Sequence, residues 1–279
     1  MLKETFQSIA TAARTVLKNW KSALLIAIVY ASLLAVLYFF VVIREATFVQ
    51  VTLTFASAIV APLLFFVLQA MIASDAGESS TGSMLRRALS SFWKLILVTL
   101  PLIALAVLIV YLLGKVQARF DANAINAAAA LPRRVSNLAN ARDAAPPIDW
   151  RAASLSTLRY LAFGLVLPLA AIHLWLATVH EGLGPALKKL KTLLARTFAP
   201  QSILIYVVGF LVFAVVPYFL LFKTVSTKHA WLEIALMVAR LAIVFALTLF
   251  GWVMTVKAIA LWSASPLSTT PPDPAVEAV

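Results

Sequence analysis

Cysteine is absent from this chain of 279 residues, and charged residues make up only 12% of it. The absence of cysteine excludes disulfide bonds, iron–sulfur clusters and a cysteine nucleophile. Hydrophobic residues reach 63%, whereas a soluble domain is roughly 45–50% apolar and about 25% charged. The alternation of polar and apolar residues that is typical of an outer-membrane barrel is also missing. These absences leave a helical membrane protein as the expected class.

Recognisable enzyme signatures are missing as well. The pair His180-Glu181 lacks the second histidine of the H-E-x-x-H motif, and the run from Gly77 to Gly82 lacks the lysine of a phosphate-binding loop. That run is not a G-x-S-x-G nucleophile elbow either. No pair of carboxylates lies inside an apolar run. We therefore expect a protein that is not an enzyme and that uses no cofactor and no metal.

Long apolar runs dominate the chain instead. They cover residues 22–43, 51–73, 92–114, 158–180, 201–222 and 234–256. Each has roughly 20 mostly apolar residues, enough to cross about 30 Å of hydrocarbon as a helix that rises about 1.5 Å per residue. The first run is too long for the apolar part of a signal peptide, so we expect it to be retained. The sequence predicts an all-α, polytopic membrane protein whose six transmembrane helices form one domain over residues 1–262.

Basic residues are distributed unevenly around these runs. One side of the predicted membrane holds 12 of them near the span ends, whereas the short loops opposite hold only 3, Arg44, Lys223 and Lys228. The connection 115–157 carries more basic residues, but long loops follow charge rules less tightly. We therefore expect a bacterial inner (plasma) membrane location with both termini in the cytoplasm and 115–157 outside. The net charge of +12 is not taken as a sign of nucleic-acid binding, because its distribution matters more. The lysines of the basic stretches are expected to face anionic lipid headgroups at the cytoplasmic face.

Parts of the chain match one another at fixed offsets. The second and fourth runs align at an offset of 106, which places Asp75 on Glu181, and the fourth and sixth align at 77, which places Trp175 on Trp252. The basic stretches align too, with Arg14, Arg87 and Lys189 in register, followed seven residues later by Lys21, Lys94 and Arg196. The matches predict three repeat units, at about 1–75, 76–181 and 182–262. Three units that all begin on the same side disfavour an inverted-repeat transporter.

Each unit begins with an amphipathic stretch. In the first, Phe6, Ile9, Val16 and Trp20 recur at helical spacing, while Lys3, Arg14 and Lys18 occupy other positions. Such a stretch is either a helix lying in the plane of the inner leaflet or a cytoplasmic extension of the next span that packs on neighbouring helices. The predicted unit is thus an amphipathic helix followed by a transmembrane hairpin.

This plan, together with the run Ser91-Phe92-Trp93-Lys94, resembles bacterial six-span membrane proteins such as the membrane domain fused to some glycerophosphodiester phosphodiesterases. The resemblance concerns architecture and implies no functional residues. No phosphodiesterase domain is present in the sequence.

Ionisable residues at membrane depth are the candidate functional positions, because placing them there is costly. His173 is expected to be a neutral imidazole that donates to a carbonyl, or else part of a proton relay. His180 and Glu181 lie at the cytoplasmic end of the fourth span, where headgroups can solvate them.

Two further candidates have predicted partners. Asp75, like Glu181, is expected to pair with a basic residue of the amphipathic helix that follows it, for example Arg86 or Lys188. Arg240 is expected either to extend outward or to meet Glu233, two helical turns away; an anion or a lipid phosphate is the alternative partner.

The segments outside the spans suggest less. Residues 119–131 predict a short helix that ends before Pro132, and the proline-rich stretch 263–279 predicts a disordered tail. Two functions remain open. The first is an accessory or assembly subunit, or a membrane-organising protein, with other membrane proteins as partners. The second is a transporter or channel for a small or lipidic substrate, suggested by the prolines within four of the spans.

Overall fold

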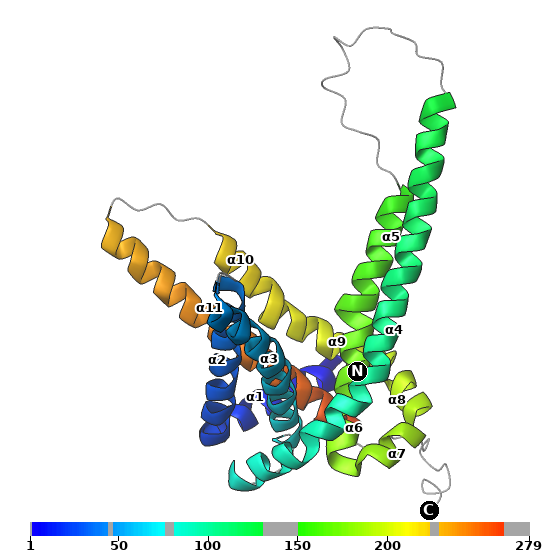
Figure 1. The fold of residues 1–279 in the computed structure, drawn as a ribbon. Coiled ribbons are helices and arrows are strands. Elements are labelled where there is room, and N and C mark those ends of the chain that lie inside the picture. The colour runs from blue at the N-terminus through cyan, green and yellow to red at the C-terminus, as the bar shows by residue number, and fades with distance from the viewer. Residues whose placement is uncertain (1, 44–46, 76–80, 131–149, 224–228, 265–279) are drawn as a thin grey trace, which may run out of the picture.

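The protein is described by a computed structural model that covers residues 2–43, 47–75, 81–130, 150–223 and 229–264 (Figure 1). All regular elements among these residues are helical, which confirms the all-α prediction. In chain order they are α1 (Leu2–Lys18), α2 (Trp20–Val42), α3 (Phe48–Ser74), α4 (Thr81–Ala130), α5 (Trp150–Leu161), the π-helical turn η1 (Ala162–Val166), α6 (Leu167–Glu181), α7 (Leu183–Lys188), α8 (Leu190–Thr197), α9 (Pro200–Phe210), the π-helical turn η2 (Leu211–Val215), α10 (Val216–Phe222) and α11 (Ala230–Ala264).

Six helical segments of the described chain are long and apolar enough to cross a membrane. They are Trp20–Val42, Phe48–Ser74, Gly82–Arg119, Ala153–Glu181, Pro200–Phe222 and Trp231–Ala264. The midpoint of each segment lies within a few residues of the midpoint of one predicted run. The number and order of the apolar helices in the described chain are therefore confirmed. Their agreement has a simple cause, since a run of apolar residues is a local property of the chain.

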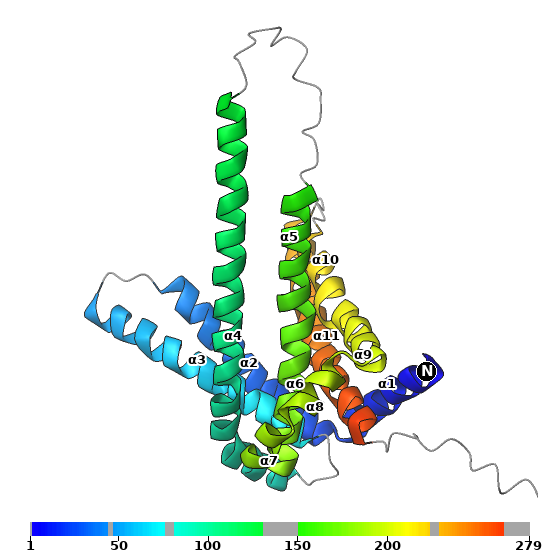
Figure 2. The same ribbon diagram turned by 90° about the vertical axis from the view of Figure 1, so that its right-hand side faces the viewer.

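The long helices form three antiparallel hairpins that splay apart from a common base (Figures 1 and 2). The hairpins are α2 with α3, α4 with α5–α6, and α9–α10 with α11. The first turns of α4 run along the base, where α7 and α8 also lie (Figure 1). The segment 153–181 is the centre of the fold: 61% of its most apolar stretch is buried, whereas only 11–17% of the corresponding stretch is buried in each of the other five segments.

Local sequence explains where several helices begin and end. Thr47 and Gln50 form a capping box at the start of α3, with the Thr47 amide donating to Gln50 Oε1 at 2.9 Å. Gly182 has φ of 92°, a conformation that favours glycine, and it ends α6 and begins α7. Pro200 occupies the first turn of α9, where its missing amide hydrogen is not needed.

The four prolines within the spans have different effects. Pro62 and Pro101 lie inside continuous helices, α3 and α4. Pro168 and Pro217 each follow a π-helical turn, η1 and η2 respectively. Proline removes a backbone hydrogen bond one turn earlier, and a π-helical turn is one way for the chain to accommodate that loss.

Two predictions about the segment ends need correction. The short helix expected at 119–131 does not start anew, because α4 continues without interruption from the span to Ala130. A helix of 50 residues is about 75 Å long, so α4 extends far beyond a bilayer core of about 30 Å. At the other end, α11 continues through Ser263 to Ala264; the remainder of the predicted tail, 265–279, lies outside the described residues.

The amphipathic helix α1 packs against α11 and α9 and is separated from α2 by a break at Asn19. Its buried side consists of Thr5, Ala12 and Val16. Phe6 remains 58% exposed and Leu17 73% exposed, although the sequence places both on the apolar face. One side of α1 therefore contacts neighbouring helices while other apolar residues stay uncovered.

Candidate functional site

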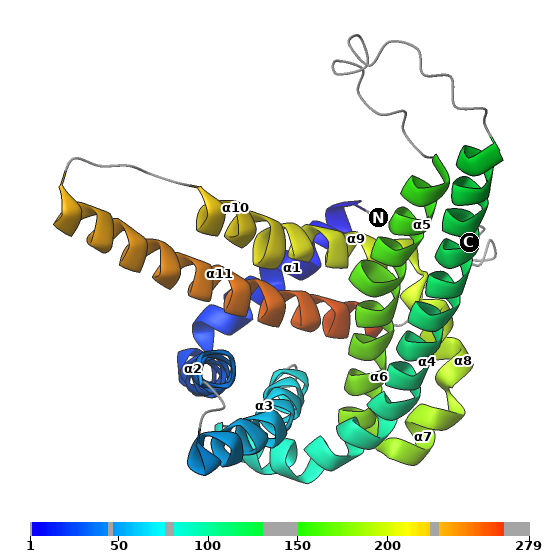
Figure 3. The same ribbon diagram turned by 45° about the horizontal axis from the view of Figure 1, so that its top comes forward.

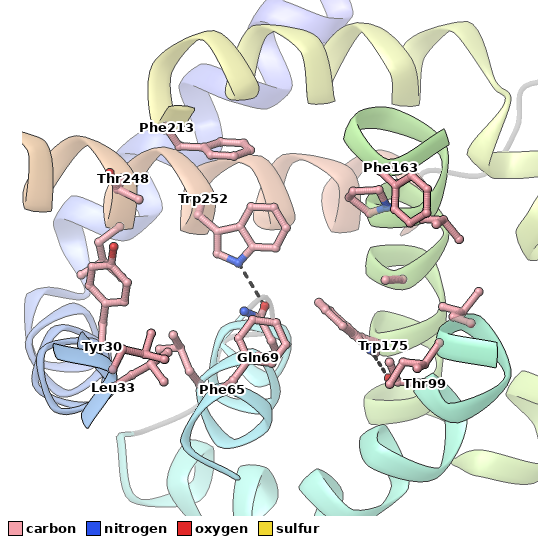
Figure 4. Close-up of a pocket in the computed structure, with 18 of the residues that line it drawn as sticks. Tyr30, Leu33, Phe65, Gln69, Thr99, Phe163, Trp175, Phe213, Thr248 and Trp252 are labelled. Atoms are coloured by element: carbon pink, nitrogen blue, oxygen red, sulfur yellow. Dashed lines mark hydrogen bonds between the residues drawn. The ribbon is translucent and has the colours of Figure 1, made fainter. Parts of the chain in front are cut away.

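A cavity of about 550 Å³ lies between the three hairpins (Figure 4). Such a volume is typical of ligand sites, which span about 300–1,000 Å³. All three hairpins contribute to its wall, which is lined by Tyr30, Leu33, Leu34, Leu37, Phe65, Leu68, Gln69, Thr99, Leu102, Ile103, Ala106, Phe163, Leu167, Pro168, Ala171, Trp175, Phe213, Thr248, Leu249 and Trp252. The cavity is thus a shared feature of the whole fold.

The polar side chains of this cavity bond to one another. The indole Nε1 of Trp252 donates to Gln69 Oε1 at 3.0 Å, and that of Trp175 donates to Thr99 Oγ1 at 2.8 Å (Figure 4). The phenol of Tyr30 faces Thr248 across the wall (Figure 4). Four hydrogen-bonding side chains of the wall therefore form two pairs between helices.

Pairing of this kind determines which ligand the cavity suits. A polar ligand that displaced either indole from its partner would leave that partner without its hydrogen bond inside the cavity. The rest of the surface is hydrocarbon and aromatic ring. The wall is complementary to an apolar guest.

Residues that the two sequence offsets relate to one another line the same cavity. The offsets of 106 and 77 relate Gln69 to Trp175 and to Trp252, and all three are in the wall. The same offsets relate Phe65 to Ala171 and to Thr248, which are also in the wall. The return helices α3, α6 and α11 therefore present corresponding positions to one central space.

A second, smaller pocket of about 270 Å³ lies near the base, between α6, α8 and the end of α11. Its polar lining consists of His173, His180, Glu181, Arg196 and Ser263. Four of these five side chains carry groups that can donate hydrogen bonds. This base pocket has a substantial polar lining, whereas the lining of the central cavity is almost entirely apolar.

The first sequence-predicted residue, His173, is only 2% exposed. Its Nε2 lies 2.9 Å from the hydroxyl of Ser202 near the start of α9. A hydroxyl on another span therefore takes the place of the expected carbonyl. The contact joins α6 to α9.

Asp75 and Lys257 form a buried ion pair near the base. Lys257 Nζ lies 2.5 Å from Asp75 Oδ2, and the two side chains are only 2% and 4% exposed, respectively. Asp75 Oδ1 and the hydroxyl of Ser74 have no hydrogen-bond partner among the described residues. The expected pairing of Asp75 with Arg86 is wrong, because the carboxylate instead joins the end of α3 to α11.

Glu181 pairs with a basic residue of the segment that follows it, as the sequence suggests, but the partner is Lys189 and not Lys188. Glu181 Oε2 lies 2.8 Å from Lys189 Nζ, on the turn between α7 and α8. Both side chains are exposed. His180, also exposed, lies beside the backbone of Ala73 at the end of α3.

Of the two arrangements expected for Arg240, the contact with Glu233 is not formed. Its guanidinium donates a hydrogen bond to the carbonyl oxygen of Lys223, the residue that ends α10. Since the last carbonyls of a helix lack partners within it, a cation there stabilises the helix end. Arg240 therefore anchors the tip of the α10/α11 hairpin, and Glu233 is not its partner.

Sequence reasoning did not find the central cavity, the two indole hydrogen bonds or the role of Lys257 as a buried partner. The repeat offsets contained one usable signal, since they place Gln69, Trp175 and Trp252 in register. Among the described residues, no group of three or more His, Asp and Glu side chains could hold a metal ion. No family model matches the chain, and neither a curated protein nor a solved structure matches it.

Proposed function

We propose that this protein is a non-enzymatic, multi-pass membrane protein that holds a hydrocarbon chain of a bilayer lipid between its three hairpins. The observation that carries the proposal is the central cavity of about 550 Å³, whose lining is almost entirely apolar and in which both indole N–H groups already have acceptors. Hydrocarbon makes no demand for hydrogen bonds, so it is the guest that leaves these indole hydrogen bonds intact.

Membrane insertion is part of the proposal. The six long apolar helices support it, and so do the large exposed side chains along the hairpins, among them Phe39, Phe55 and Phe219. An exposed apolar surface of this size is costly in water and suits lipid or another membrane protein. The excess of basic residues on the side that holds the termini supports a cytoplasmic position for both of them.

A threefold repeat explains how such a cavity is built. Three units, each an amphipathic segment followed by a hairpin, place equivalent return helices around one centre. The positions Gln69, Trp175 and Trp252 support this organisation, because they share one cavity wall. A bacterial inner membrane and a membrane-organising or accessory role, with other membrane proteins around the splayed hairpins, complete the proposal.

Transport of a lipidic substrate is the second candidate. The π-helical turns η1 and η2 favour it, since each lies in a cavity-lining segment, at Phe163 and Phe213, and next to a proline. Such turns often occur at functional positions, where they allow a helix to change shape. A transporter would move labelled lipid between the leaflets of a vesicle, whereas a lipid-holding protein would not.

The lipid-binding proposal is tested by photocrosslinking in nanodiscs with a phospholipid that carries a photoactivatable group near the middle of its acyl chain. We expect adducts on cavity residues. The variant Ala106→Phe adds a phenyl ring at the cavity wall, takes up part of the space for the guest and should reduce labelling of the wall by at least about half. Ala104→Phe is the matched control, because Ala104 lies on the same helix but is exposed outside the cavity.

The reasoning is refuted by labelling that spreads evenly over the outer faces of the hairpins and is the same in both variants. Far-ultraviolet circular dichroism and size-exclusion chromatography of each variant check that the fold is retained. Labelling confined to the cavity but insensitive to both substitutions would likewise count against the proposal, since a phenyl ring must displace part of the guest.

A further inference from the structure

The base pocket combines a half-buried arginine with other hydrogen-bond donors. Arg196 comes from the end of α8, His173 and His180 come from α6, and Ser263 comes from the end of α11. Figure 2 shows α6, α8 and the end of α11 near one another, and in Figure 3 the end of α11 reaches α6; α6 contacts both of the other helices. The pocket therefore draws donors from segments far apart in the sequence.

Two of these donors have no acceptor within the described part of the chain. Arg196 forms no ion pair with any described carboxylate. The hydroxyl oxygen of Ser263 is buried and has no hydrogen-bond partner among the described residues. A buried polar group without a partner is costly, so a group that satisfies it from outside the chain would bind favourably.

The charges around the pocket favour an anion. The one carboxylate in its lining, Glu181, is already paired with Lys189 at 2.8 Å, so its negative charge is balanced. Arg196 then remains as the uncompensated charge. Its planar guanidinium can donate two parallel hydrogen bonds to two oxygens of a phosphate.

We propose that the base pocket binds a phosphate group, either in the headgroup of an anionic phospholipid or in a soluble phosphate ester. In this arrangement Arg196 contacts two phosphate oxygens, Ser263 donates to a third, and His180 closes the exposed side. His173, held by Ser202, forms the buried floor. A volume of about 270 Å³ accommodates a headgroup but not a whole phospholipid.

This site is separate from the central cavity. Ala171 and Trp175 line the cavity, whereas His173, Ala177 and His180 line the base pocket. At 3.6 residues per turn these two sets lie on opposite faces of α6. The lipid source rests on the proposed membrane insertion, while the soluble source does not.

Binding is measured on the full-length protein with two probes. Titration calorimetry in detergent uses glycerol 3-phosphate, and native mass spectrometry of the protein with bound lipid uses phosphatidic acid against phosphatidylcholine. For the probe that binds, we expect Arg196→Gln to weaken affinity about 10- to 100-fold, the loss of a charge-assisted hydrogen bond. Ser263→Ala should weaken it about 2- to 10-fold, as for a neutral hydrogen bond.

The matched control is Lys191→Gln, which removes one positive charge from an exposed position of the same helix, outside the pocket. It should change affinity by less than about twofold, as expected for an exposed charge. Arg196→Lys keeps the charge without the two-pronged geometry and should give an intermediate affinity. This variant also guards against loss of folding in Arg196→Gln.

Each outcome decides the proposal. Binding of glycerol 3-phosphate that depends on Arg196 supports a soluble ester, and selective retention of phosphatidic acid alone supports a headgroup. Equal losses in Arg196→Gln and Lys191→Gln would mean a diffuse surface charge and would overturn the site. Absence of binding with both probes would overturn it as well.

Discussion

Removing one partner of the buried Asp75–Lys257 pair should destabilise the fold strongly. In Lys257→Met a carboxylate that is 4% exposed loses its counter-charge, and Asp75 Oδ1 already has no hydrogen-bond partner among the described residues. Loss of one member of a buried pair costs about 3–5 kcal/mol, because the remaining charge stays in a poorly solvated site. We expect the same magnitude for Asp75→Leu.

Removing both partners should cost far less. The double variant Asp75→Leu/Lys257→Met has no buried charge, and apolar replacements of buried pairs range from neutral to about 1–4 kcal/mol more stable. If the single losses were additive, the double variant would lose about 6–10 kcal/mol, twice the single cost. The double-mutant cycle should therefore show strong non-additivity between α3 and α11.

The assay is the free energy of unfolding in mixed micelles, measured by denaturant titration with tryptophan fluorescence. The second ion pair of the described chain serves as control: Glu181 and Lys189 approach to 2.8 Å, but their side chains are 40% and 58% exposed. Lys189→Met should cost less than about 1 kcal/mol, as for other surface pairs. Two small, additive losses at Asp75 and Lys257 would refute the reasoning.

Two further predictions concern packing and orientation. Gly209→Val should lower the free energy of unfolding or push α9 and α11 apart, because a Cβ at Gly209 would overlap the hydroxyl of Thr255. Gly114→Val is the control: no atom lies within 4 Å of a Cβ there, so it should have little effect in the same unfolding assay. In this cysteine-free chain, Lys18→Cys should react with a membrane-impermeant maleimide only after cells are permeabilised, whereas Phe48→Cys should react in intact cells. The reverse labelling pattern would contradict the proposed orientation.

Much of the secondary structure could be predicted because its causes are local. The six apolar runs became six long helices, and Gly182 and Pro200 mark helix boundaries that glycine and proline favour. The sequence predicts a separate alanine-rich helix after the third apolar run, whereas in the structure this segment continues α4 to Ala130. Helix propensity alone does not tell whether two adjacent helical segments are continuous.

The ion pairs and hydrogen bonds between distant helices could not be predicted in the same way. The acidic residue Asp75 was expected to contact a basic residue nearby in sequence, yet the splayed hairpins bring the ends of α3 and α11 together, and Lys257 is the nearest cation in space. The hydrogen bond between Trp252 and Gln69 joins residues 183 positions apart. Contacts of this kind depend on how hairpins are arranged, which hydropathy does not encode.

The amino-acid sequence by itself determined the helical class, the six apolar helices and their order, since these follow from composition and from the need of a backbone to satisfy its own hydrogen bonds. Only the tertiary structure decided what the helices enclose. It brought Gln69, Trp175 and Trp252 around one apolar cavity and placed Arg196 with Ser263 in a separate polar pocket. Cavities are left where side chains from distant segments fail to meet, and that is a property of packing rather than of any single segment.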